Sequence, residues 1–317
     1  MYDLDLLVIG EINPDLILGG PDLAPVFGQA EKLVEAATLT VGSSSVIMAC
    51  GAARLGLCTA FIGVVGNDEF GRFMLEAMQA RGVDTSACVI DDALTTGLSV
   101  ILSQPHDRAI LTHLGAISAL RADQVKRDML RRARHLHVGS YFLLDALRPD
   151  LPTLYAQAHE MGLSTSLDTN WDPSGEWDGG LAQLLPECDL FMPNAAEAQL
   201  IARREGLDAA LDMLATHVPT LAVKLGAEGG LARQGETVVH APSLAVSVVD
   251  TTGAGDSFDA GFLYGYLNGW PLEKSLRLAC ACGSLSTRTA GGTTGQATLS
   301  EALAAMGETC DYQAGAD

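Results

Sequence analysis

Apolar and polar positions alternate along the chain in blocks, and the blocks predict strands and helices in regular succession. Residues 6–9 form an unbroken apolar run that ends at Gly10, which is typical of a strand buried on both faces. Residues 44–55 and 69–81 repeat their apolar side chains at helical spacing, and a glycine follows each segment. Repeated strand–helix units indicate a mostly parallel central sheet flanked by helices on both faces. The other expected elements are strands at 60–65, 135–138, 164–167, 190–192 and 220–224, helices at 122–133, 151–161, 195–202 and 208–216, and a hairpin near 230–240.

A different pattern occupies the stretch between about residues 88 and 113. Short alternating pieces at 98–102 and 109–112 are separated by turn residues, which is typical of antiparallel hairpins with one face in water. The apolar piece at 16–18 could join them. We therefore expect a small β-sheet appended to a larger α/β domain. The expected boundaries are 1–310 for the domain, about 12–40 and 86–116 for the segments that contribute the small sheet, and 311–317 for a tail.

The composition and net charge of the chain exclude several classes of protein. The chain has 317 residues, with 19 Lys and Arg against 39 Asp and Glu, so its formal net charge is −20. This charge argues against general binding to nucleic acid. No apolar run reaches the roughly 18 residues that span a bilayer, and the acids near Met1 differ from a secretory signal. The seven cysteines are scattered without a CxxC pair, which favours reduced thiols. We therefore expect a cytoplasmic protein with neither nucleic-acid nor membrane partners.

The segment with the clearest candidate chemistry is a Gly-Ala-Gly run at 253–255. It follows an apolar, strand-like stretch at 244–249 and opens an apolar helix. The first turn of a helix leaves backbone N–H groups unpaired and carries partial positive charge, so it favours phosphate oxygens. Asp256 lies in the same turn, where bound phosphate would repel it unless it accepts a proton from an attacking hydroxyl. Phosphoryl transfer is therefore one interpretation of this segment.

Simpler interpretations of the same residues stay open from spacing alone. The glycines could serve tight packing only, and the helix dipole favours an aspartate in a first turn. A dinucleotide-binding fingerprint is disfavoured because Phe258 replaces the third glycine and the segment lies far from the first strand. A P-loop is disfavoured too, because no Gly-Lys-Ser/Thr follows the glycines.

Residues 250–261 resemble the C-terminal signature of the ribokinase-like (PfkB) carbohydrate kinases, and the match is nearly residue for residue. They read Asp-Thr-Thr-Gly-Ala-Gly-Asp-Ser-Phe-Asp-Ala-Gly. Further stretches resemble family motifs in the same order across most of the chain. These stretches are the first-strand segment 10–15, the N-terminal signature region at 53–56 and 63–71, the Asn-x-x-Glu motif at 194–197 and the turn at 224–229.

The resemblance implies a ribokinase-like α/β fold in which the small β-sheet forms a lid. It also implies ATP-dependent transfer of the γ-phosphoryl group to a hydroxymethyl of a small sugar, with Asp256 as the general base. Gly253, Ala254 and Gly255 would supply backbone N–H groups to the transferring group as an anion hole. Lids of this family often build a dimer interface, so a homodimer through the lid is one arrangement that the resemblance implies.

The same resemblance implies the cofactors ATP and Mg²⁺. Glu197, with Asn194, would hold Mg²⁺ through water, since this ion keeps several waters and takes few protein ligands. Asp250 and Thr252 match positions at which many relatives bind a monovalent cation, here K⁺. The positions implied to bind ATP are Asn194, Lys224, Gly226, Gly229 and Thr252.

The acceptor side departs from the family pattern. Asp15, which could also serve only as a turn residue, would accept two sugar hydroxyls and repel an anionic substrate, while Gly42 would let the sugar approach the backbone. In the usual Gly-Gly-x-x-x-Asn-x-Ala pattern, Ser43 here replaces the second glycine and Ile47 replaces the asparagine. An isoleucine neither donates nor accepts a hydrogen bond, so the pattern does not identify the acceptor. We expect a neutral sugar, with a nucleoside kinase or a non-catalytic sugar- or nucleotide-binding relative as alternatives.

Overall fold

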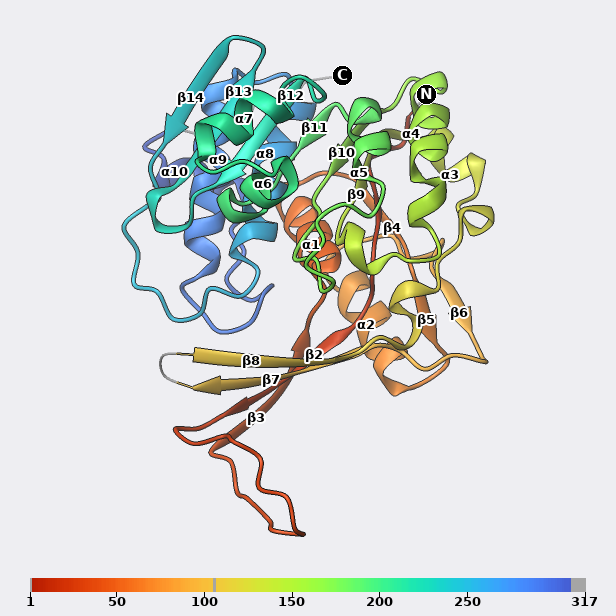
Figure 1. Cartoon of the computed structure of the whole chain (residues 1–317), viewed down its shortest axis with the longest axis vertical. Helices are drawn as coiled ribbons and strands as arrows, with labels where there is room; N and C mark the ends of the chain where they lie inside the picture. Colours follow the sequence, from red (N-terminus) through yellow and green to blue (C-terminus); the bar gives the residue numbers. More distant parts are fainter. Residues whose placement is uncertain (1, 105–106, 309–317) are drawn as a thin grey trace, which may run out of the picture.

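The main body of the protein is built on one eight-stranded sheet. The computed structural model describes residues 2–104 and 107–308, so the expected tail at 311–317 lies outside the described residues. In sheet order the strands are β14 (Thr237–Ala241), β13 (Gly230–Gln234), β12 (Thr220–Lys224), β11 (Leu190–Phe191), β10 (Ser164–Leu167), β9 (Ala133–Val138), β1 (Leu4–Ile9) and β4 (Thr59–Ile62). All neighbouring strands from β12 to β4 are parallel, and β13 and β14 extend the β12 edge as an antiparallel hairpin (Figure 1).

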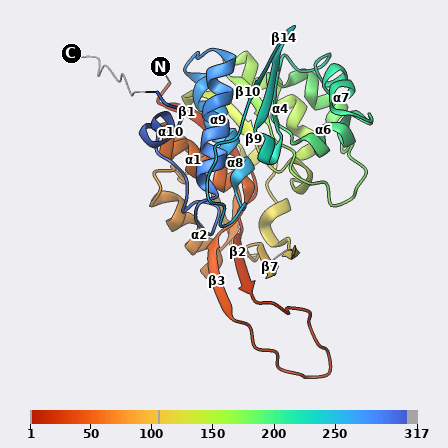
Figure 2. The ribbon, with the colours of Figure 1, turned by 90° about the vertical axis from the view of Figure 1, so that its left-hand side faces the viewer.

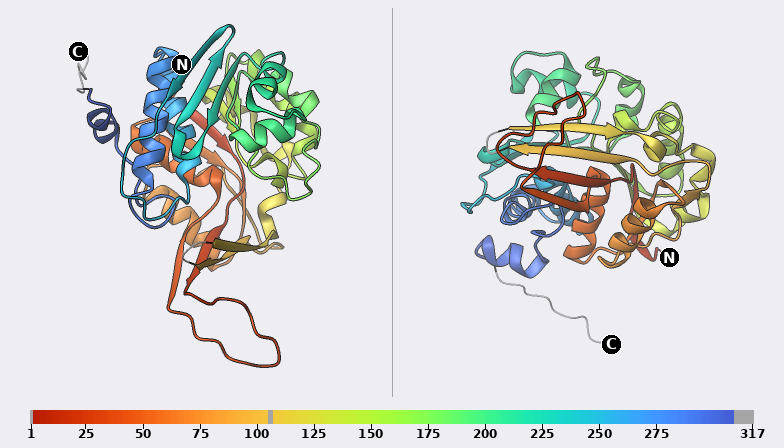
Figure 3. Two further views of the ribbon diagram at one scale, coloured as in Figure 1. Left: turned by 60° about the vertical axis from the view of Figure 1, so that its left-hand side comes forward. Right: turned by 90° about the horizontal axis from the view of Figure 1, so that it is seen from below.

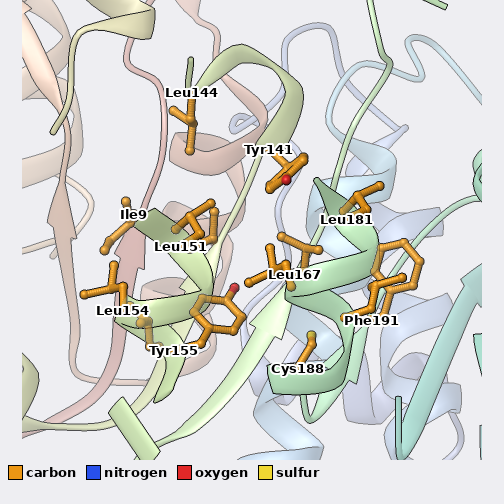
Figure 4. Close-up of a cluster of buried hydrophobic side chains, with 14 of the residues drawn as sticks. Ile9, Tyr141, Leu144, Leu151, Leu154, Tyr155, Leu167, Leu181, Cys188 and Phe191 are labelled. Atoms are coloured by element: carbon orange, nitrogen blue, oxygen red, sulfur yellow. The ribbon is translucent and has the colours of Figure 1, made fainter. Parts of the chain in front are cut away.

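Helices cover both faces of this sheet because its central strands are apolar on both sides. In β1, Leu7 and Ile9 pack into the hydrophobic core on one face, and Leu6 and Val8 into the core on the other. Figure 4 shows part of the first core, where Tyr155 lies beside Leu167. The helices on the first face are α3 (Arg127–Arg132), α4 (Leu151–Glu160), α5 (Leu181–Leu184), α6 (Ala195–Ala202) and α7 (Leu207–Leu214); those on the second are α1 (Ser44–Leu55), α2 (Glu69–Gln79), α8 (Ala254–Leu267), α9 (Leu272–Ser286) and α10 (Leu299–Ala305).

A second, four-stranded sheet stands apart from the main sheet, and the right view of Figure 3 shows it from below. Its strands, in order, are β3 (Ala36–Val41), β2 (Pro14–Gly19), β7 (Leu98–Gln104) and β8 (Asp107–His113). The segment 20–35 that joins β2 to β3 has no regular secondary structure and projects away from the body (Figure 2). A mostly parallel sheet with helices on both faces and a smaller β-sheet is therefore confirmed.

Three local expectations are wrong. The single strand expected at 60–65 is two strands, because β5 (Val64–Gly66) leaves the main sheet and pairs with β6 (Val89–Asp91). The helix expected at 122–133 is a short 3-10 turn followed by α3, and β9 already begins at Ala133. The strand-like stretch 244–249 lies outside every described sheet, since the backbone N–H of Leu244 donates to the Ser284 hydroxyl at 3.0 Å and not to a neighbouring strand.

Candidate active site

A cleft of about 1190 Å³ lies where the carboxyl ends of the main-sheet strands meet the small sheet. Ligands of open parallel sheets bind at such carboxyl ends. The cleft lining joins segments that are far apart in the sequence. Asp15, Ser99 and Thr112 come from the small sheet, and Asp168, Lys224 and Asp256 come from the main body.

The N-terminus of α8 opens into this cleft. Gly253 precedes the helix with φ 74°, a left-handed conformation that favours glycine. A Cβ there would lie 2.8 Å from Gly292 Cα, so the close approach also requires a glycine. In the part of the chain that the structure describes, no acceptor is paired with the backbone N–H groups of Gly255 and Asp256. These two amides are therefore available to an anion in the cleft.

Asp256 lines the cleft beside these amides and is half-buried. Burial raises its pKa well above the usual value, and the negative charges of Asp168 and Glu11 raise it further, while Lys224 opposes them. A carboxylate with a raised pKa is a better proton acceptor than a solvated one. Asp256 thus combines a place in the cleft beside two unpaired amides with a raised pKa.

Lys224, for which the family resemblance implies a role in binding ATP, is held by two carboxylates. Its Nζ lies 2.7 Å from Asp168 Oδ2 and 2.9 Å from Asp259 Oδ2. Burial raises the pKa of Asp168, but the charge of Lys224 and the hydrogen bonds with Asp259, Lys224 and the Asn170 backbone together outweigh it and lower this pKa to about 2. Lys224 still lines the cleft, and its aliphatic stem lies against Gly255, where a Cβ would be 3.3 Å from Lys224 Cδ. The two ion pairs therefore hold the Lys224 ammonium group in place in the wall of the cleft.

Asn194 and Glu197 face the cleft from the first turn of α6, where they form a reciprocal cap. Glu197 N donates to Asn194 Oδ1 at 2.9 Å, and Asn194 N donates to Glu197 Oε2 at 2.8 Å. Burial and the charge of Asp168 raise the pKa of Glu197 to about 7. The excess of buried negative charge and the oxygen ligands fit a hydrated Mg²⁺, which would relieve that charge. Among the described residues, no cluster of three or more His, Cys, Asp or Glu is arranged to bind a metal.

Asp250 and Thr252 form a turn behind the α8 N-terminus. Asp250 Oδ1 accepts hydrogen bonds from Thr252 N at 2.9 Å and Thr252 Oγ1 at 2.8 Å. Asp250 Oδ2 accepts from Gly291 N at 2.9 Å. The structure brings the two predicted cation-site residues together, with both carboxylate oxygens engaged by protein donors.

On the acceptor side, Asp15 and Gly42 are in contact, as β2 and β3 are paired there. A Cβ on Gly42 would lie 2.8 Å from the Asn13 carbonyl oxygen and even closer to Asp15, so only glycine fits. Asn13 Nδ2 donates to Asp15 Oδ1 at 3.3 Å and to Ser99 Oγ at 3.3 Å. The Asp15 carboxylate thus lies in the cleft and accepts a hydrogen bond from Asn13.

Ser43 and Ile47 have largely structural contacts. The Ser43 hydroxyl accepts from Val46 N at 3.0 Å, which caps α1, and donates to the Glu11 carbonyl at 2.7 Å. Ile47 is 3% exposed and packs against Gly292, where a Cβ would lie 2.9 Å from Ile47 Cγ1. The isoleucine therefore supports the packing behind the α8 N-terminus, although both side chains also line the cleft.

A second cavity, of about 410 Å³, lies on the far side of Gly255. Lys224, Gly226 and Gly255 line both cavities, so the two adjoin at the α8 N-terminus. Gly229 turns the chain beside the second cavity with φ 97°, and a Cβ there would lie 2.6 Å from the Pro242 carbonyl carbon. The remaining wall includes Leu244, Val246, Phe258, Ser284 and Thr287.

Sequence reasoning missed several residues of this site. Glu11 and Asp259 are buried acids that lie inside matched motifs, but their partners come from distant segments, so the motifs alone assign them no contact. Residues 244–246, which belong to the stretch 244–249 expected to be strand-like, form a wall of the second cavity instead. These residues are apolar, but the sequence that follows them offers no further strand with which they could pair. This combination is the signal that could have identified the loop.

Solved structures with this architecture define the class of protein. A probable sugar kinase from Rhizobium etli superposes with a TM-score of 0.85 at 25% identity, over 97% of this chain and 99% of that one. A putative ribokinase II from E. coli, solved with ATP and Mg²⁺, has the same fold with a TM-score of 0.84 at 23% identity, over 96% of this chain and 99% of that one. The fold is therefore ribokinase-like, the fold of a class of sugar kinases.

Sequence comparison then identifies the family. The model of the pfkB family of carbohydrate kinases matches residues 3–299, so the chain belongs to this family and is an enzyme of the carbohydrate kinase type. An uncharacterized sugar kinase from Archaeoglobus fulgidus is 32% identical over 72% of this chain and 90% of its own. A 5-dehydro-2-deoxygluconokinase from Geobacillus thermodenitrificans is 28% identical over 89% of this chain and 87% of its own.

The comparisons support ATP and Mg²⁺ as the cofactors of the family.

Within residues 2–104 and 107–308, none of the helices combines the length and apolar character required to cross a membrane. The six cysteines within these ranges are all free thiols.

Proposed function

We propose that this protein transfers the γ-phosphoryl group of ATP to a hydroxymethyl of a small sugar, with Asp256 as the general base. One observation carries the proposal: the unpaired amides of Gly255 and Asp256 and the Asp256 carboxylate face the same cleft, next to the carboxyl edge of the sheet. An anion site and a proton acceptor side by side are what phosphoryl transfer to an alcohol requires.

Each group has a distinct part in this reaction. The unpaired amides of Gly255 and Asp256 stabilise charge on the transferring group, whereas the Ala254 amide donates to the Thr251 carbonyl at 3.2 Å and holds the turn at 253–255. Asp256 takes the proton of the attacking hydroxyl, and its raised pKa suits that step. Glu197, capped by Asn194, would hold Mg²⁺ through water, and the bound ion supplies neutralisation of phosphate charge.

The second cavity is proposed to hold the base of ATP. It adjoins the phosphate end at Gly226 and Gly255, and its wall of Leu244, Val246 and Phe258 is apolar, as suits an aromatic ring system. Lys224 lines both cavities, and Gly229 shapes the turn beside the second one. Thr252 belongs to the turn that leads into the phosphate site.

A neutral acceptor is proposed on the charge of the cleft. Carboxylates dominate the described lining, and its cations, Lys224 and Arg148, are both paired, the latter with Asp145 at 3.0 Å. An anionic acceptor would therefore meet Asp15 without an available cation. Relatives named as kinases of a deoxygluconate derivative and of ribose 1-phosphate, and an adenosine kinase of similar structure, define the competing acceptor classes.

ADP release with Mg-ATP should be measured across neutral sugars, sugar acids, sugar phosphates and nucleosides. The proposal expects the largest kcat/KM with a neutral sugar. A sugar acid, sugar phosphate or nucleoside that turns over far better than every neutral sugar contradicts the neutral preference, and leaves the phosphoryl-transfer chemistry intact.

The small sheet is proposed to be the lid of the cleft and a dimer interface. Phe27 is 95% exposed and Leu33 is 85% exposed on the projecting segment 20–35 (Figure 2), and a second copy of the chain would bury them. Sedimentation should then detect a dimer that Phe27→Ser weakens; an unchanged monomer contradicts the interface.

A monovalent cation beside Asp250 and Thr252 is a further part of the proposal, because the turn they form lies directly behind the anion site. Turnover should rise when K⁺ replaces a bulky organic cation at equal ionic strength. Equal rates in the two salts contradict a cation requirement.

The general-base assignment is tested by Asp256→Asn. This variant should lose kcat by about 100- to 10,000-fold, the usual contribution of a positioned base, while calorimetry shows ATP affinity close to wild type. Near wild-type turnover by Asp256→Asn would refute the assignment, and loss of ATP binding together with turnover would indicate a structural role for the carboxylate.

A further inference from the structure

One large aromatic side chain lies mostly uncovered in the wall of the cleft. Trp171, in the loop that follows β10, lines the cleft and is 59% exposed. Tryptophan is highly buried on average in folded proteins, because its ring carries a large apolar surface. The indole of Trp171 therefore offers an apolar surface to a molecule bound in the cleft.

The Trp171 ring is the outer end of a row of aromatic rings. It packs edge-to-face with Trp177, with 4.8 Å between the ring centroids, and Trp177 packs in the same way with Phe142 at 5.7 Å. Trp177 and Phe142 are 6% and 4% exposed. The two buried rings support the Trp171 ring, while most of its own surface stays open to the solvent.

The loop that carries Trp171 is held in one conformation by its own hydrogen bonds. Asp172 Oδ1 accepts from Ser174 N at 2.9 Å, and Asp172 Oδ2 accepts from Trp177 N at 2.7 Å. Trp177 has a φ of 55°, a left-handed conformation that a bulky residue rarely adopts, so the closed loop carries backbone strain. On the other side, Trp171 N donates to Asn170 Oδ1 at 2.9 Å. Because both flanks of Trp171 are fixed, a ligand has little of this loop to order when it binds.

Polar side chains that suit hydroxyl groups line the same cleft from the small sheet. They are the Asp15 carboxylate and the hydroxyls of Ser99 and Thr112. A cyclic sugar has both kinds of surface, since hydroxyl groups surround its ring and C–H bonds form an apolar patch on a ring face. An open-chain polyol has no fixed patch of this kind. An apolar platform combined with a few polar groups is typical of small-molecule sites, and here it matches a closed sugar ring.

We propose that Trp171 is a specificity-determining residue of the acceptor site, whose indole stacks on the C–H face of a cyclic neutral sugar while the small sheet binds the hydroxyls. The inference rests on the proposed function and narrows its acceptor to neutral sugars in closed-ring form. A ring that stacks on Trp171 removes apolar surface from water, whereas an open chain must first be ordered. The sugar should therefore bind more tightly than the alditol obtained by its reduction, and the difference should depend on Trp171.

Steady-state kinetics with the best neutral sugar tests this contact, with the matching alditol as a substrate or competitive inhibitor. Trp171→Ala should raise the KM for the cyclic sugar by about 10- to 50-fold, as expected for the loss of one stacked indole face. The kcat and the KM for ATP should change little. Trp171→Phe keeps a flat apolar ring and should restore most of the affinity. The preference of the wild type for the sugar over its alditol should shrink in Trp171→Ala.

Tryptophan fluorescence supplies a readout that does not depend on turnover. The chain has three tryptophans, and Trp171 lines the cleft whereas Trp177 and Trp270 are outside the described lining of both cavities. Addition of the sugar to protein saturated with Mg²⁺ and a non-hydrolysable ATP analogue should change the emission of the wild type. Trp270→Phe is the matched control and should keep this change, because Trp270 packs against Tyr264 with 5.4 Å between the ring centroids. Trp171→Phe should lose it.

Two results overturn the inference. One is a Trp171→Ala enzyme with the wild-type KM for the cyclic sugar. The other is an equal weakening of the sugar and its alditol, which would make the contact indifferent to the ring. Trp171 is exposed, so its truncation should leave thermal stability close to that of wild type, and melting curves verify that each variant is folded.

Asp256→Asn measured alongside separates this inference from the proposed function. If Asp256→Asn is inactive while Trp171→Ala has wild-type kinetics, only the stacking contact is wrong. If Asp256→Asn keeps turnover while Trp171→Ala raises the KM for the sugar, the contact is supported and the assignment of the base is wrong. If no cyclic neutral sugar is phosphorylated or changes the emission, the proposed acceptor class fails together with the inference.

Discussion

Replacing Lys224 with methionine should destabilise the fold strongly, because it leaves two buried carboxylates without their cation. The Lys224 side chain is 13% exposed, and those of Asp168 and Asp259 are 10% and 2% exposed. Breaking a buried ion pair by removal of one partner costs about 3–5 kcal/mol. The low pKa of Asp168, about 2, depends on Lys224, so in the variant this carboxyl must either stay charged in the interior or take up a proton.

Urea unfolding at pH 7 measures the effect as a change in the free energy of unfolding. Lys126→Met, at an exposed lysine, is the matched control and should change it by less than about 0.5 kcal/mol. The defect of Lys224→Met should shrink as the pH falls towards 4, since protonation then removes the unpaired charge. Adding Asp259→Asn to the variant should recover part of the loss. A Lys224→Met protein within about 1 kcal/mol of wild type at pH 7 would refute the reasoning.

Three further outcomes follow from the structure. Burial lowers the pKa of His137 to about 3 and also lowers that of His135 well below its usual range, so the unfolded chain takes up protons below about pH 6.5 that the folded chain does not. The free energy of unfolding by urea should therefore fall as the pH drops from 6.5 towards 3, and a His137→Asn variant with the same slope as wild type would contradict this. Gly253→Ala forces a Cβ against Gly292 at a φ of 74°, so it should cost about 1–3 kcal/mol in thermal unfolding and lower kcat; wild-type values for both would argue against the close approach. Asp15→Asn should raise the KM for the acceptor by about 10-fold while the KM for ATP stays constant, and the reverse pattern would place Asp15 on the nucleotide side.

The sequence predicts those parts of the fold whose signal is local. The run at 6–9 is apolar at every position because both faces of β1 are covered, and that pattern needs no knowledge of partners. The Gly-x-Gly turn before α8 is also local, since a positive φ and unpaired amides follow from the residue types. The resemblance to a family then assigns Asp256 and Glu197 to roles that spacing alone left open.

The parts that could not be predicted depend on contacts between distant segments. Lys224 has the pattern of a nucleotide-side lysine, but its ammonium group is paired with Asp168 and Asp259. Ile47 occupies the position of a sugar-binding asparagine, but it packs under the α8 N-terminus. The stretch 244–249 is as apolar as a strand, yet it forms a cavity wall after Pro242, which has no backbone donor for a ladder.

A crystal structure with ADP, Mg²⁺, an aluminium fluoride mimic of the transferring group and an acceptor sugar tests the central claim most directly. The account predicts the fluoride within hydrogen-bond distance of the Gly255 amide, and the acceptor hydroxyl within hydrogen-bond distance of the Asp256 carboxylate. A fluoride bound away from the α8 N-terminus, or an acceptor hydroxyl directed to another base, would contradict it.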